Sequence, residues 1–331
     1  MGPLTKQQHE WGFVCGRISA LEGELMTYEF FLALASLERP EELFHRLQDT
    51  SLRDFILPGA ASWEDWSTII DTYVHNRVMS LRRDSPDPAI ANIFSLAEDY
   101  LNLKRALMNQ GSYPFLTSIL SEEKLAAVAG GDSNLLPDIL RPSVALLSTS
   151  VGGDADNPFL VDIVLDGAYF RHYVALGASL NAPSITMWVN ERALERALVV
   201  LWRAMRAGHP LKLYQQYFLP IGDYDGVIRD LMATSDPQAW GGLVPGAMGE
   251  FWRECQQYPE DEQIARFEAL AANYLTELAK QAKLQTAGPE RVAGYLWGLW
   301  VEAFNLKLVI SGQLNRLERE ILKSRVRGCY V

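Results

Sequence analysis

The sequence predicts an all-α protein, and three observations carry that prediction. Apolar residues recur at intervals of three and four along most of the chain, which is the spacing of one face of an α-helix. Strand signals are thin, because no Asn-Gly hairpin turn occurs and the β-branched run Val161–Val164 lies inside a longer helical pattern. The third observation is that a long helical pattern followed by a shorter one recurs along the chain.

Long amphipathic helices are predicted, in chain order, at Ser62–Arg83, Asp87–Gly111, Asn190–Gly208, Pro259–Lys283 and Gly288–Gly312. Pro88 in a first turn and Gly111 after a last turn suit the two ends of one of these helices. The helix after Pro259 begins with acids and closes on lysines, which complements the helix dipole. Shorter helices are predicted at Arg39–Leu47 and Gly226–Ser235, and loops at Asp84–Pro88, Gly130–Asn134, Ser150–Pro158, Leu219–Gly226 and Gly241–Glu250.

The repeated unit is a long helix that ends at a glycine and leads into a shorter helix. This order occurs at Gly111, at Gly208 and at Gly312. We therefore predict a single domain with three internal pseudo-repeats. They are expected at about 88–185, at 186–288, and at 289–331 packed with 1–87.

Two of the long helices share an acid followed three positions later by asparagine. The pairs are Asp99 with Asn102 and Glu302 with Asn305, and this spacing places both side chains on one helix face. Asparagine is unfavourable inside a helix and costs free energy among apolar residues unless its amide is hydrogen-bonded. We interpret each pair as a buried hydrogen-bond clamp between a helix and its neighbour. The alternatives are contact with a ligand or partner, and catalysis. In the middle repeat, Ala197 or a neighbour stands in place of asparagine.

Charge and hydropathy exclude several classes of function. A net charge of −11 argues against a broad electrostatic interaction with nucleic acid or anionic lipid, since both attract positive charge. No apolar run approaches the ~18–20 residues of a membrane span, so no transmembrane segment is expected. The three cysteines are far apart and odd in number, which predicts neither a disulfide framework nor a zinc ribbon.

Motifs of catalysis are missing from the sequence. No phosphate-binding P-loop, no serine nucleophile motif and no histidine pair at zinc-binding spacing occurs. We therefore expect no catalytic, cofactor-binding or metal-binding residue and no cofactor.

One loop is a candidate for contact with a partner. It runs from Tyr217 to Asp225 and contains an aromatic residue, Gly222, and the two acids Asp223 and Asp225. Unpaired acids are not tolerated in a core, and aromatic residues are frequent at interfaces. The alternative is an ordinary exposed loop.

The order of these motifs resembles the C subunit of V-type and A-type rotary ATPases, called subunit d in the eukaryotic vacuolar enzymes. The similar segments are Trp11–Phe31, Leu47–Ile56, Ala97–Leu107, Leu201–Gly208, Tyr217–Met232 and Gly294–Val331. Two positions depart from the family's pattern. Ala197 or Val199 stands where the family usually has asparagine, and Pro220 with Ile221 stands where it often has a glycine pair or a basic residue.

The resemblance implies a non-catalytic subunit with three similar helical lobes that form a funnel or socket. Its partners would be the coiled-coil subunit of the central stalk on one side and the proteolipid ring of the membrane sector on the other. The protein would then be peripheral, at the cytoplasmic face of a membrane, and would couple rotor shaft to ring for proton or sodium transport.

Two other classes of protein remain open from the residues alone. The first is a generic α-helical scaffold or adaptor unrelated to rotary motors. The second is an α-helical enzyme such as a prenyl-chain synthase, which requires two aspartate-rich D-D-x-x-D motifs for metal; the sequence has none.

Overall fold

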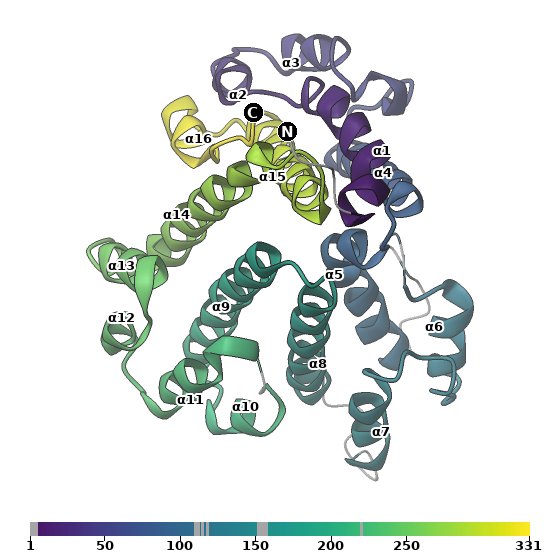
Figure 1. The fold of residues 1–331 in the computed structure, drawn as a ribbon. Coiled ribbons are helices and arrows are strands. Elements are labelled where there is room, and N and C mark those ends of the chain that lie inside the picture. Colours follow the sequence, from purple (N-terminus) through teal and green to yellow (C-terminus); the bar gives the residue numbers. More distant parts are fainter. Residues whose placement is uncertain (1–5, 109–112, 114–115, 117–118, 151–157, 219–220) are drawn as a thin grey trace. The chain divides into compact units, whose positions relative to one another are not determined.

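The computed structural model describes residues 6–108, 113, 116, 119–150, 158–218 and 221–331 (Figure 1). Every regular element in these residues is a helix, which confirms the predicted all-α class. The chain divides into two compact units. Unit 1 consists of residues 1–94 and 272–331, and unit 2 consists of residues 95–271.

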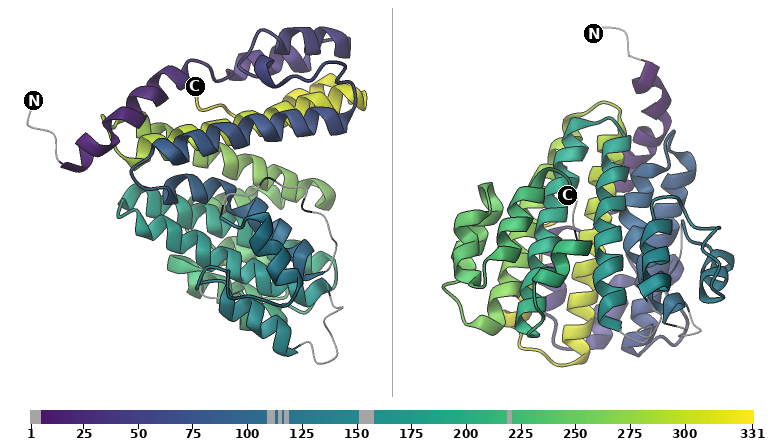
Figure 2. Two further views of the ribbon diagram at one scale, coloured as in Figure 1. Left: turned by 90° about the vertical axis from the view of Figure 1, so that its right-hand side faces the viewer. Right: turned by 90° about the horizontal axis from the view of Figure 1, so that it is seen from below.

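Unit 1 is built around one long helix. Its elements are α1 (Lys6–Glu22), α2 (Tyr28–Ala35), α3 (Pro40–Leu47), η1 (Arg53–Phe55), α4 (Trp63–Asp84), the start of α5 (Ala89–Leu107), the end of α14 (Glu260–Lys280), η4 (Gln281–Leu284), α15 (Pro289–Leu314) and α16 (Arg319–Arg325). Helix α15 packs against α1, α2, α3, α4, η4 and α16. Figure 2 shows α4 and α15 running alongside each other. A helix covered on so many sides must be apolar nearly all round, as the sequence of α15 is.

The segment that follows α16 packs on α15. A Cβ atom on Gly298 would come within 2.7 Å of the Tyr330 side chain, so this glycine allows the ring to lie against the helix. The Tyr330 carbonyl accepts a hydrogen bond of 2.7 Å from Lys283 Nζ, and the Tyr330 hydroxyl donates one of 3.1 Å to Glu22. The end of the chain is therefore fixed in unit 1 by packing and by hydrogen bonds to two other elements.

Unit 2 contains the rest of α5 and most of α14. Between them lie α6 (Glu122–Ala129), α7 (Arg141–Ser150), α8 (Pro158–Ser179), α9 (Pro183–Arg206), α10 (Lys212–Tyr217), η2 (Gly222–Tyr224), α11 (Asp225–Ala233), η3 (Pro237–Ala239), α12 (Trp240–Leu243) and α13 (Gly246–Cys255). A short turn joins α8 and α9, which pack side by side as a helical hairpin (Figure 1). Asn181 in this turn has a φ of 52°, a conformation that asparagine adopts more readily than most residues.

The predicted loop at Gly241–Glu250 is wrong, because the segment forms α12 and the start of α13. Two of the glycines that suggested a loop, Gly241 and Gly249, serve close packing instead. A Cβ atom on Gly249 would lie 2.0 Å from the carbonyl oxygen of Val244. The buried rings of Trp240 and Trp252, 5.3 Å apart, hold the two short helices together.

The predicted helix ends at glycine have mixed outcomes. Helix α9 ends at Arg206, and Gly208 follows with a φ of 75°, as a terminating glycine should. Helix α15 runs through Gly312 to Leu314, so that prediction is wrong. Gly312 is a packing glycine, since a Cβ atom there would lie 2.6 Å from the Leu322 side chain. Gly111 lies outside the described residues.

Gly167 offers a test of helix packing in unit 2. A Cβ atom on Gly167 in α8 would lie 1.8 Å from the Tyr217 carbonyl oxygen at the end of α10. Gly167→Ala should therefore lower the free energy of unfolding by about 1–3 kcal/mol in urea titrations. The control is Gly226→Ala in α11, which has open space at Cβ and should leave stability unchanged or slightly raised. Equal effects of the two substitutions would contradict this close contact.

Candidate functional site

The two predicted acids hold equivalent backbone groups in their own units. In unit 2, the Asp99 carboxylate accepts hydrogen bonds from the N–H groups of Ile119 (2.9 Å) and Leu120 (3.2 Å). Leu120 directly precedes Ser121, the N-cap residue of α6. Asp99 therefore fixes the point at which the chain enters a short helix.

Glu302 does the same in unit 1. Its Oε2 accepts a hydrogen bond of 2.6 Å from the N–H of Met26, which directly precedes Thr27, the N-cap residue of α2. Its Oε1 accepts a second bond of 2.9 Å from the Tyr73 hydroxyl of α4. The two long helices α5 and α15 thus carry acids that bind the residue before the N-cap of a shorter helix.

The predicted asparagines are both fully buried. Asn305 forms a paired contact with the segment after α16: its Nδ2 donates to the carbonyl oxygen of Arg327, and its Oδ1 accepts from the N–H of Arg327, both at 2.9 Å. Nδ2 also contacts the Cys329 sulfur at 3.6 Å. The amide of Asn305 therefore satisfies both backbone groups of a residue that belongs to no helix. Asn102 occupies a buried position in α5, one turn after Asp99.

The middle long helix holds a buried asparagine whose role the sequence did not reveal. Helix α9 begins at Pro183 rather than at the expected Asn190, so Asn190 lies in the second turn and is only 3% exposed. Its Nδ2 donates to the Asp223 carboxylate at 2.7 Å. Pro183 is the signal that locates the true start, because proline favours the first turn of a helix. Ala197 and Val199, at the positions where an asparagine was expected, are buried and apolar.

The candidate contact loop separates into parts with different surroundings. The Tyr217 carbonyl accepts a hydrogen bond of 2.8 Å from Arg171, and the Asp225 carboxylate accepts one from the N–H of Ile221. Both residues thus take part in local structure. Gly222 has a φ of 71°, and a Cβ atom there would lie 2.6 Å from Asn190 Oδ1. Asp223 is exposed and lies at the edge of a pocket with Asn190.

Burial changes the acidity of two of the enclosed groups. Burial raises the pKa of Glu302 from 4.5 to about 7, against the opposing effect of its two hydrogen bonds. Burial lowers the pKa of His172, in α8, to about 4. His172 Nδ1 lies 3.3 Å from the Tyr100 hydroxyl, so its ring joins a buried contact between α8 and α5. Each of these groups is enclosed by packed helices of its own unit.

Two further features of the described part of the chain are the arrangement of its metal-ligating side chains and the apolar length of its helices. There, no group of three or more His, Cys, Asp or Glu side chains is arranged to hold a metal ion. None of the helices in that part is long and apolar enough to cross a membrane. The predicted acids and Asn305 each make a hydrogen bond that joins their side chain to the backbone of another segment.

Replacing Asn305 tests the paired contact with Arg327. Asn305→Leu removes the amide that pairs with the buried N–H and the buried carbonyl of Arg327, so we expect a loss of roughly 2–5 kcal/mol in the free energy of unfolding. Asn305→Asp should also destabilise, because a carboxylate oxygen would face the Arg327 carbonyl oxygen. Urea titration measures both, with the exposed Asn134→Asp as the control. A loss below about 0.5 kcal/mol for Asn305→Leu would contradict the clamp.

Glu302 makes the stability of the protein depend on pH. A carboxyl with a folded pKa of about 7 and an ordinary unfolded pKa holds its proton in the folded state but loses it on unfolding between pH 4.5 and 7. The free energy of unfolding should therefore fall by at most roughly 3 kcal/mol as the pH rises through this window. Above the window, the contribution of Glu302 should no longer change with pH. Urea titrations between about pH 5 and 8 measure the profile.

Glu302→Gln is the variant that isolates this effect. Its profile should lack the fall from about pH 5 to pH 7, so that the difference between wild type and variant changes with pH. His172 acts in the opposite sense, because a lowered folded pKa removes stability as pH falls from 6.5 towards 4. His172 is present in both proteins and cancels in the difference. Parallel profiles for wild type and Glu302→Gln would show that Glu302 does not titrate in this range.

Comparison with known proteins identifies the family. The family model described as "ATP synthase (C/AC39) subunit" matches residues 14–325, which include most of unit 1, all of unit 2 and all the predicted site residues. No curated protein matches the chain. The family is one of non-catalytic subunits of V-type and A-type ATPases, and it is the same family that the sequence motifs resemble. The chain belongs to the ATP synthase (C/AC39) subunit family.

Proposed function

We propose that this protein is the non-catalytic central-stalk subunit of a V/A-type rotary ATPase, where it acts as a socket between the rotor shaft and the proteolipid ring. The observation that carries the proposal is the family match over residues 14–325. The partners are a coiled-coil subunit of the central stalk and the membrane-embedded ring. The protein sits at the cytoplasmic membrane face as a peripheral subunit and serves transport of protons or sodium ions.

The internal contacts suit a part that transmits torque. Such a part has to keep its helices in fixed register under load, and packed, fully hydrogen-bonded interiors resist deformation. The Glu302 and Asn305 contacts bind α15 to the start of α2 and to the segment after α16 within unit 1. Asp99 binds α5 to the start of α6 within unit 2.

Three pseudo-repeats, at about 88–185, at 186–288, and at 289–331 with 1–87, remain part of this proposal. Two of them carry an acid that binds the residue before the N-cap of a shorter helix. A socket with threefold pseudo-symmetry would present similar lobes around a single shaft. The generic scaffold alternative has no comparable support, because it does not explain the family match.

A reconstituted complex tests the proposed role. Omission of this subunit should leave ATP hydrolysis by the catalytic head in place but abolish ATP-driven ion transport, because torque no longer reaches the ring. The measurements are phosphate release and ion uptake into vesicles, each with and without the purified protein. The purified protein alone should release no phosphate. Ion transport at an undiminished rate in its absence would contradict the socket role.

A further inference from the structure

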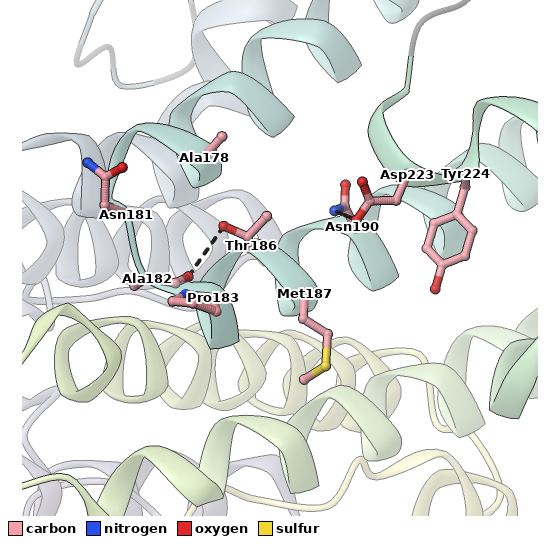
Figure 3. Close-up of a pocket in the computed structure, with 9 residues that line it drawn as sticks. All are labelled: Ala178, Asn181, Ala182, Pro183, Thr186, Met187, Asn190, Asp223 and Tyr224. Carbon is pink, nitrogen blue, oxygen red and sulfur yellow. Dashed lines mark hydrogen bonds between the residues drawn. The ribbon is translucent and has the colours of Figure 1, made fainter.

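A pocket of about 500 Å³ lies in unit 2, between the turn that joins α8 to α9, the first two turns of α9, and η2 (Figure 3). One part of its lining is apolar and comes from Ala178, Ala182, Pro183 and Met187. Met187 is 47% exposed, although methionine is usually enclosed in a core. An exposed, flexible thioether beside small apolar residues is well suited to contact an aliphatic chain.

The other end of the pocket is acidic. The Asp223 carboxylate is exposed and accepts a hydrogen bond from Asn190 Nδ2. Beside it, the Tyr224 hydroxyl donates a hydrogen bond of 2.5 Å to Glu191. Within the described residues, neither Asp223 nor Glu191 forms an ion pair, so two negative charges stand here without a cation. An anionic guest would be repelled, whereas a cation would be attracted.

Asn190 positions Asp223 at a cost to the fold. Its amide is almost completely buried, and its Oδ1 has no hydrogen-bond partner in the described residues. A buried acceptor without a partner is unfavourable. The backbone at Gly222 approaches so closely that only glycine fits beside Oδ1. A leucine at position 190 would have no buried polar atom and would avoid this cost in free energy. The contribution of Asn190 is therefore its hydrogen bond to Asp223, which orients that carboxylate towards the pocket.

We propose that this pocket binds a lysine or arginine side chain presented by a partner protein. The aliphatic stem would lie along Ala182, Pro183 and Met187, and the charged head would bind Asp223. The proposal that this partner is the central-stalk subunit rests on the function proposed above. The net charge of −11 makes a basic partner favourable at longer range.

The first experiment tests the pocket without any partner protein. In the full chain labelled with ¹³C at its methionine methyl groups, the Met187 signal is assigned by Met187→Leu and followed by NMR during titration. The probes are Nα-acetyl-arginine amide and Nα-acetyl-lysine amide, with the neutral Nα-acetyl-norleucine amide and acetate as controls. The arginine and lysine probes should shift the Met187 signal saturably, and their two affinities show which head is preferred; the controls should not. A shift with norleucine, or none with either cation, overturns the proposal.

Variants assign the interaction to Asp223. Asp223→Asn should weaken binding of the cationic probes at least tenfold, whereas Asp230→Asn, an exposed acid of α11 outside the pocket, should leave it unchanged. Asn190→Leu alone should weaken binding of the cationic probes. Combined with Asp223→Asn, it should weaken binding little beyond the effect of Asp223→Asn alone, because Asn190 acts through the Asp223 carboxylate. If Asp223→Asn and Asp230→Asn weaken binding equally, the probes respond to the negative charge of the surface in general and not to the pocket, and the proposal is overturned.

The second experiment measures binding of the purified cognate stalk subunit. Asp223→Asn should raise its dissociation constant about tenfold, and Asp230→Asn should not. If both variants bind the stalk subunit like wild type, the stalk does not occupy the pocket, and the partner assignment is overturned. If wild type itself binds no stalk subunit, the proposed function fails, and the probe titration alone decides whether the pocket binds a basic side chain.

Discussion

The contact on which the rest of the structure depends is the one between a buried acid on a long helix and the backbone N–H just before a shorter helix. Asp99 in α5 and Glu302 in α15 both make it. A helix start has N–H groups without partners, and the chain that enters it has to be fixed in direction. By binding the residue before the N-cap, each acid sets where the short helix begins relative to the long one.

Helix α9 is joined to the segment that follows it by other residues, and the proposed binding pocket depends on this difference. Glu195, the buried acid of this helix, pairs with Arg192 on the same helix, and among the residues that the structure describes it binds no distant backbone group. The contact with the following loop passes to Asn190, which binds the side chain of Asp223. An acid that binds backbone N–H groups is fully engaged within the fold. Asp223, bound by one amide, keeps oxygen atoms for another donor.

The sequence was sufficient to predict where most helices lie, but not which distant segments their polar side chains bind. Periodicity located α4, α5, α14, α15 and most of α9, because apolar spacing is a local property, but α8 was not among the predicted long helices. The polar residues Asn102 and Asn305 stood out inside apolar stripes. The glycines of α12, α13 and α15 misled the prediction, because a glycine that ends a helix and one that allows close packing look alike in one dimension. The Met26 N–H that Glu302 binds lies 276 residues away in the chain, and the pocket beside Asn190 joins segments more than thirty residues apart, so no local pattern could reveal either.

Buried polar contacts of this kind favour specificity over stability. An apolar residue in place of Glu302 would avoid the cost of burying a carboxyl, which raises the pKa of Glu302 to about 7. It would also leave the Met26 N–H without its acceptor and take one of two partners from the Tyr73 hydroxyl. Apolar packing tolerates small shifts along a helix, whereas a hydrogen bond of 2.6 Å does not. In the proposed role, the subunit has to keep its helices in register under torque. It would then gain from the Glu302 carboxyl even though its ionisation weakens the fold near neutral pH, since the same group defines one register of α15 against α2 and α4.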